Sequence, residues 1–259
     1  MSVTYTSYLR IAELLDCQKP LSDGPEHDEM LFIVIHQVYE LWFKQMLHEL
    51  DYLAERLGAD DLAAAQSTFK RILTILKVQV AQIDILETMS PVSFLSFRSR
   101  LEAASGFQSP QFRELEFVLG ARDPKFLAWH ENTPSLARLE RRLAEPSLWD
   151  VFVGFLSRRG FAVPASLLER DRTLSNPETA ELHPQLLEIY RRWPDLAQLC
   201  ERLVDLDEGL QEWRYRHVKM VERTIGAKPG TGGSSGVEYL RRTLFRPLFP
   251  DLWAIRGEL

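Results

Sequence analysis

The sequence has little cysteine, no long apolar run and no excess of basic charge, and each shortage excludes a class of protein. Two cysteines, Cys17 and Cys200, occur among the 259 residues, and they form no CxxC pair. We therefore expect reduced thiols in a reducing compartment rather than a disulfide framework. The apolar runs are short, as Leu31 to Ile35 illustrates, whereas a membrane-spanning helix needs about 20 apolar residues. The sequence thus predicts no membrane span.

Charge and chain ends exclude further classes. Lysine and arginine number 31 against 37 acidic residues, for a net charge of -6, whereas a nucleic-acid binder usually has a basic excess. The first six residues lack the basic and apolar regions of a secretory signal. With 13 glycines and 14 prolines, little of the chain should be disordered. We expect an acidic, globular, cytoplasmic protein that binds neither nucleic acid nor a membrane.

What the sequence has in abundance is apolar residues at the 3.6-residue period of an α-helix. Long helices are predicted over about 26–57, 62–89 and 194–225. The first is apolar on more than one face, which is typical of a helix buried in a bundle. The last carries one apolar stripe that includes Trp213 and His217, and Gly226 ends it.

Proline and glycine mark the ends of shorter helices. Ser90 and Pro91 end the second long helix and start a helix to about residue 104. Ser109 and Pro110 start another, which Gly120 closes. We predict an all-α protein with one domain over residues 1–259, built as a bundle of long antiparallel helices. Further short helices are expected over 134–144, 146–159, 164–170, 178–191 and 237–245.

Two histidines stand on apolar helix faces. His217 lies four residues after Trp213, and His36 lies four after Phe32. Each is either a core histidine bonded to a neighbour or a ligand offered into a dry pocket, as haem ligation requires. No HxxxH or ExxH pair lies nearby, so a di-iron or zinc bundle has little support. The other histidines have polar surroundings and are expected at the surface, namely His27, His48, His130 and His183.

Two further features bear on binding. Arg98 follows Phe94 and Phe97, and it is either a structural ion-pair partner or a bidentate receptor for a carboxylate. The loop 230–236 resembles a phosphate cradle in composition only, because it follows a helix and lacks the GK[ST] ending. The Thr231 hydroxyl in this loop is able to donate to a carboxylate or accept from an ammonium. The residues alone predict a helical protein whose histidines are suited to holding a cofactor.

Several segments resemble the tryptophan 2,3-dioxygenase family, in the family's order and spacing over almost the whole chain. Together they are highly specific, although the glycine loop alone is not. They are Tyr5-Thr6-Ser7-Tyr8-Leu9, His27-Asp28-Glu29, Leu31-Phe32-Ile33, His36-Gln37, Glu40-Leu41-Trp42, Ser96-Phe97-Arg98, Ala104-Ser105-Gly106-Phe107-Gln108-Ser109, Gln111-Phe112-Arg113, Trp213-Arg214-Tyr215-Arg216-His217-Val218 and Gly230-Thr231-Gly232-Gly233-Ser234-Ser235-Gly236.

The resemblance implies a bundle around a haem pocket, with one haem b per subunit. It implies oxidative cleavage of the indole C2–C3 bond of L-tryptophan by O₂, giving N-formylkynurenine, the first step of the kynurenine pathway. It also implies a homotetramer in which residues 1–20 contact a neighbouring subunit.

The resemblance further implies roles for individual residues. His217 matches the axial ligand of the haem iron. His36 matches the distal histidine that hydrogen-bonds the indole N–H, and Arg98 matches the clamp on the substrate carboxylate. Thr231 matches the hydroxyl that holds the α-substituents. Phe32, Phe94 and Leu101 match the indole wall, while Tyr5, Tyr8 and Leu9 match the segment that closes a neighbour's pocket.

One unusual residue and two alternative functions remain to be considered. Tyr39 occupies a slot that is usually small or polar in the family, where it either alters the pocket or packs between helices. A biosynthetic homologue that oxygenates a modified tryptophan, acting as a monooxygenase, would use the same haem and clamp. A haem-binding sensor without turnover would need His217 but has no use for Arg98 and Thr231.

Overall fold

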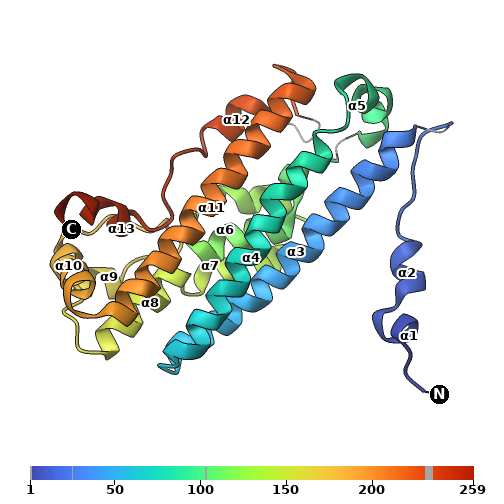
Figure 1. The fold of residues 1–259 in the computed structure, drawn as a ribbon. Helices are drawn as coiled ribbons and strands as arrows, with labels where there is room; N and C mark the ends of the chain where they lie inside the picture. The colour runs from blue at the N-terminus through green and yellow to red at the C-terminus, as the bar shows by residue number, and fades with distance from the viewer. Residues whose placement is uncertain (1, 25, 103, 231–235) are drawn as a thin grey trace.

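Three long helices form the centre of the fold. In the computed structural model, which describes residues 2–24, 26–102, 104–230 and 236–259, they are α3 (His27–Gly58), α4 (Leu62–Leu86) and α11 (Pro194–Ile225). They lie side by side with α4 between the other two (Figure 1). Every regular element of these four described ranges is helical, so the predicted all-α fold is confirmed. The prediction that the long helices are all antiparallel is wrong for one pair, because α4 and α11 run in the same direction.

Shorter helices pack around this centre, while the two at the N-terminus lie apart from it (Figure 1). They include the predicted helices and several that the sequence patterns missed. In chain order they are α1 (Tyr5–Leu9), α2 (Ile11–Leu15), α5 (Pro91–Phe97), η1 (Arg98–Leu101), η2 (Gly106–Gln108), α6 (Pro110–Leu119), η3 (Pro124–His130), α7 (Leu136–Ala144), α8 (Leu148–Arg158), α9 (Ala165–Leu168), η4 (Ala180–Leu182), α10 (His183–Arg192), α12 (Val237–Arg241), α13 (Pro250–Ala254) and η5 (Ile255–Glu258).

Capping chemistry explains which boundaries were predictable. The Ser109 hydroxyl accepts from the Phe112 N–H at 3.1 Å, and Gly120 ends α6 with a φ of 94°, as expected. The helix from Pro91 is shorter than predicted, because α5 gives way at Arg98 to a 3₁₀ turn that ends at Glu102 with a φ of 46°.

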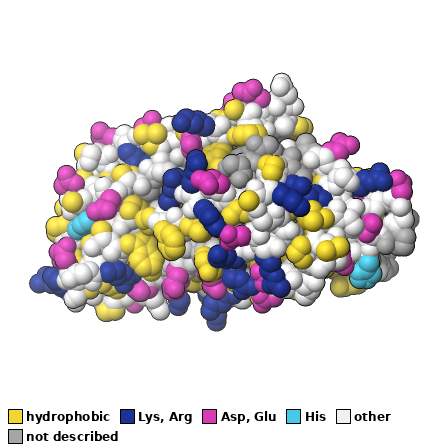
Figure 2. Space-filling model, turned by 90° about the horizontal axis from the view of Figure 1, so that it is seen from above, with side chains coloured by type: hydrophobic (Ala, Val, Ile, Leu, Met, Phe, Trp, Pro, Cys, Tyr) yellow, Lys and Arg dark blue, Asp and Glu magenta, His cyan; other side chains and the backbone are white. Residues whose placement is uncertain are grey.

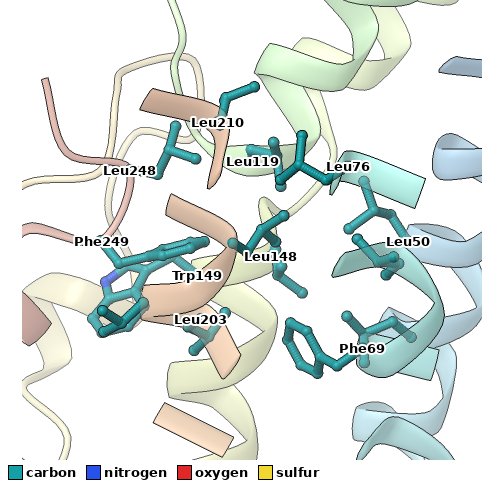
Figure 3. Close-up of a cluster of buried hydrophobic side chains, with 14 of the residues drawn as sticks. Leu50, Phe69, Leu76, Leu119, Leu148, Trp149, Leu203, Leu210, Leu248 and Phe249 are labelled. Carbon is teal, nitrogen blue, oxygen red and sulfur yellow. The ribbon is translucent and has the colours of Figure 1, made fainter. Parts of the chain in front are cut away.

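The core runs along the bundle, and at one end it borders a pocket that the same three long helices line. Figure 3 shows Leu50 of α3, Phe69 of α4 and Leu203 of α11 in this core, with Trp149 of α8 packed against Phe249. All five side chains are almost completely buried. The packing of the core therefore fixes the spacing of the helices that build the pocket.

The prediction that α3 is buried all round is wrong on one face. Met30, Val34 and Leu41 are 43%, 39% and 50% exposed, because α4, α5, α6 and α8 pack on the other sides of the helix. The remaining exposed surface mixes charges of both signs, as Figure 2 shows on one side of the molecule. No helix within the described ranges is long and apolar enough to cross a membrane.

Two histidines expected at the surface lie inside instead. His130 is only 4% exposed, because η3 turns its side chain inward. His183 is mostly buried at the start of α10, where its Nε2 lies 3.0 Å from Oδ1 of Asp251. The polar sequence around both residues did not reveal these tertiary contacts.

Side chains of α11 hold the C-terminal segment, residues 242–249, by its backbone. Arg214 donates to the Thr243 carbonyl at 3.3 Å, and Gln211 accepts from the Phe245 N–H at 3.2 Å. Asp207, fully buried, accepts from the backbone N–H groups of residues 248 and 249 at 2.7 and 3.1 Å and from the Trp253 indole at 2.9 Å. The helix predicted over 237–245 ends at Arg241, and Phe245, which Gln211 binds through its N–H, adopts a left-handed φ of 59° instead.

Replacing Asp207 should loosen the C-terminal segment. Asp207→Ala leaves three donors without an acceptor, so we expect the free energy of unfolding to fall by about 2–4 kcal/mol. Asp207→Asn keeps one carbonyl oxygen and should lose less. Urea denaturation followed by circular dichroism measures both variants. The exposed Asp205, two residues away, is the control, and an Asp207→Ala variant as stable as Asp205→Ala would contradict the assignment.

Candidate functional site

A pocket of about 260 Å³ opens between the N-terminal half of α3 and the C-terminal ends of α4 and α11, and it is lined mostly by apolar side chains. α3 contributes Phe32 and His36, and α11 contributes His217. α4 closes the pocket with Ile83 and Leu86. Further lining groups come from α5, η1, the loop after η1, α6, α12 and the chain on either side of α12, including Phe94, Arg98, Leu101, Ser105, Phe112, Arg113, Glu116, Gly230, Gly236, Tyr239 and Thr243.

His36 is held with a defined tautomer. Its Nδ1 lies 2.7 Å from the carbonyl oxygen of Phe32, one helical turn earlier. A carbonyl only accepts, so Nδ1 carries the hydrogen, and Nε2 of the neutral ring is an acceptor. Burial lowers the pKa of His36, although the bond to Phe32 and the charge of Glu40 oppose this. His36 therefore offers a hydrogen-bond acceptor in a dry pocket.

His217 faces the same pocket with no hydrogen-bond partner among the described residues. Its ring stacks on Trp213, with centroids 5.1 Å apart and planes 8° apart. Burial, helped by the nearby His36, lowers the pKa of His217 to about 4. A neutral imidazole with an unused nitrogen is the form that ligates a metal.

The described part of the chain contains no cluster of three or more histidine, cysteine or acidic side chains placed to hold a metal ion. The apolar lining around His217 suits the flat faces of a porphyrin.

Aromatic rings form one wall. The Phe32 ring lies 4.1 Å from His36, 5.8 Å from Phe94 and 5.6 Å from Phe97. Leu101 lies on the same lining. These contacts bring the predicted indole wall together beside His36.

Arg98 reaches across the pocket mouth to the glycine loop. Its Nη2 donates to the carbonyl oxygen of Pro229 at 2.7 Å. Glycine is required at the far side of the loop, because Gly236 has a φ of 64° and a Cβ there would lie 2.8 Å from the Lys228 carbonyl oxygen. Thr231 itself lies outside the described residues.

A buried ion network in the pocket wall was missed from the sequence. Glu116 accepts from Arg214 at 2.8 Å through one carboxylate oxygen and from Arg113 through the other. All three side chains are at most 8% exposed. Arg113 and Glu116 are three residues apart on α6, a spacing that indicates an ion pair. Their third member, Arg214, lies 98 residues after Glu116 in the chain and could not be found in this way.

The N-terminal residues do not join this pocket in the single chain. Tyr5, Tyr8 and Leu9 lie on α1 and are 75%, 77% and 44% exposed, and α1 is distant from the pocket helices (Figure 1). Tyr39, by contrast, lines the pocket with its ring, while its hydroxyl donates to the Gln79 carbonyl of α4 at 2.7 Å. The Tyr39 hydroxyl thus links α3 to α4.

Known proteins resemble this chain over nearly its full length. A family model described as tryptophan 2,3-dioxygenase matches residues 1–145 and 166–259. A protein of that name from Herpetosiphon aurantiacus is 59% identical, and the aligned region covers 100% of this chain and 99% of the relative. One from Anaeromyxobacter sp. is 57% identical, with coverage of 100% and 97%. One from Caulobacter vibrioides is 47% identical, with coverage of 99% and 98%.

The lowered pKa of His217 predicts a pH dependence of stability. Its pKa is about 4 in the folded chain and about 6.5 when unfolded, so the unfolded state takes up the proton first as the pH falls. Above about pH 6.5 His217 does not lower the free energy of unfolding, and as the pH falls to roughly 4 this free energy declines by up to about 3 kcal/mol. Urea unfolding of the cofactor-free protein between pH 7 and 4.5 measures this. His217→Leu should flatten the decline, and identical slopes in both proteins would refute the assignment.

Proposed function

This chain belongs to the tryptophan 2,3-dioxygenase family, and from that premise we propose that it uses haem b and O₂ to cleave the indole C2–C3 bond of L-tryptophan. The product is N-formylkynurenine, which begins the kynurenine pathway. The observation that carries the proposal is the meeting of His217, His36 and Arg98, from three separate elements, around one apolar pocket. The names of the relatives point to the same reaction.

The residues fit a haem, with His217 as the axial ligand. The imidazole is neutral, lacks a hydrogen-bond partner within the described ranges and faces apolar walls. The chemistry that the haem supplies when bound is the activation of O₂ at its iron. Both oxygen atoms enter the product, so the reaction consumes no external electrons and needs no reductase.

His36 orients the indole. Because Nδ1 is engaged by the Phe32 carbonyl, Nε2 is left as an acceptor for the indole N–H. The depressed pKa keeps the ring neutral at physiological pH, so this acceptor is available. Phe32, Phe94 and Leu101 enclose the apolar part of the indole and exclude water.

Arg98 holds the other end of the substrate. Its guanidinium has five donors, so the bond to Pro229 leaves others for a carboxylate. Thr231, by the family resemblance, holds the α-substituents. Contacts at the indole, the carboxylate and the α-substituents define the chirality of the α-carbon, which favours L- over D-tryptophan and disfavours tryptamine.

We propose that the active form is a cytoplasmic homotetramer in which the N-terminal segment of one subunit closes the pocket of another. Tyr5, Tyr8 and Leu9 are exposed and distant from their own pocket, which supports a role in a neighbour. The exposed apolar residues on α3 provide a surface for such contacts.

The competing readings have less support. Because the Tyr39 hydroxyl is engaged by Gln79, this residue no longer favours a modified tryptophan as substrate. A sensor would not need the carboxylate receptor that Arg98 provides.

Isotope labelling tests the reaction directly. The ferrous, haem-loaded protein is mixed with L-tryptophan and ¹⁸O₂, and the product is analysed by mass spectrometry. We expect N-formylkynurenine with two labelled oxygens. A single labelled oxygen, or no product from a protein with a normal haem spectrum, would overturn the proposed reaction.

Arg98→Gln should weaken substrate binding and leave haem binding intact. Loss of a charge-assisted bond in a dry site costs about 2–5 kcal/mol, so we expect KM for L-tryptophan to rise about 30-fold or more. Arg100→Gln is the matched control, because Arg100 pairs with Asp23 at 2.9 Å on the surface. Equal KM values for the two variants would remove Arg98 from the substrate site.

A further inference from the structure

We propose that Trp213 is a positioning residue that sets the orientation of the His217 imidazole and hence of the bond from this ring to the haem iron. The inference deepens the proposed function and rests on it, because it takes His217 as the axial ligand. Its own evidence is the geometry around Trp213.

The two pocket histidines are anchored in different ways. His36 is fixed by the 2.7 Å hydrogen bond from Nδ1 to the Phe32 carbonyl. His217 makes no hydrogen bond within the described chain, although a ligating histidine normally donates its second N–H to a partner that fixes the ring. The contact that the structure gives the His217 ring is with the indole of Trp213.

The stack with Trp213 is that contact. The two residues are one helical turn apart on α11, so their side chains meet on one face. The planes differ by 8°, and the centroids are 5.1 Å apart. By comparison, the equivalent pair of Phe32 and His36 is tilted by 38°. Rotation of the imidazole about its Cβ–Cγ bond would break the parallel overlap with the indole.

Trp213 is itself held by rings from other helices. Tyr39 and Phe43 of α3 meet its indole edge-on, at 6.2 Å and 71° and at 6.4 Å and 83°. Phe112 of α6 packs against it at 5.1 Å. The hydroxyl of Tyr39 is in turn bound to the Gln79 carbonyl of α4. The orientation of His217 is thus transmitted from three other helices through one indole.

The test compares Trp213→Leu, Trp213→Phe and Trp42→Leu. Trp42 is the matched control, because it packs partly buried against the same core but lies outside the pocket lining. The rate of haem release is measured by transfer to excess apomyoglobin, and the absorption spectrum of the ferrous protein reports the iron–histidine bond.

We expect Trp213→Leu to release haem about 10-fold faster than the parent, the scale of losses from disrupting groups that orient metal ligands. Its ferrous spectrum should shift, whereas Trp42→Leu should change neither readout. Trp213→Phe keeps a planar ring and should restore the parent spectrum, with release no more than about 3-fold faster. If Trp213→Leu fails to fold, Trp213→Met serves as the non-aromatic variant and should behave as predicted for leucine.

Equal release rates and unchanged spectra in the Trp213 and Trp42 variants would overturn the positioning role. His217→Ala separates this outcome from a failure of the proposed function. If His217→Ala loses haem while Trp213→Leu behaves like the parent, the ligand assignment stands and only the positioning role is wrong. If His217→Ala retains haem with the parent spectrum, the ligand assignment itself fails.

Discussion

The packing of α4 between α3, which runs antiparallel to it, and α11, which runs parallel to it, is the constraint on which the rest of the structure depends. Each of these helices buries apolar side chains in the core along its length and lines the pocket near one end. Leu50 and His36 belong to one continuous helix, as do Leu203 and His217. A close-packed core transmits its geometry along stiff helices, so the separation of the two pocket histidines follows from contacts made elsewhere.

The pocket wall also contains charge that a purely apolar site would lack. Glu116 is shared by Arg113 and Arg214, and all three are buried. Buried charges are tolerated when each has a partner of opposite sign and further hydrogen bonds. Arg214 meets the second condition by donating to the Thr243 carbonyl, which ties the C-terminal segment to the pocket. The wall is thereby joined to a part of the chain that contributes few side chains to the pocket itself.

Local sequence patterns predicted the long helices and the two pocket histidines. The 3.6-residue period gave the three long helices, and the bounds of α11 match the prediction because Pro194 and Gly226 punctuate the sequence. The apolar surroundings of His36 and His217 marked both as candidates. That they share a pocket with Arg98 depends on tertiary packing, which periodicity does not encode. The same limit explains the burial of His130, the link from Glu116 to Arg214, and the short helices α1, α2 and α13, whose lengths leave no periodic pattern to detect.

The continuity of α11 from the core into the pocket has a thermodynamic consequence. Leu203 and His217 cannot change their helical state independently without breaking the helix between them, so occupation of the pocket and integrity of the core belong to one equilibrium. A group that binds only the folded chain adds about 2.7 kcal/mol of stability at 100 times its dissociation constant. A cofactor that occupies this pocket would therefore raise the fraction of the protein that is folded as well as the fraction that is active.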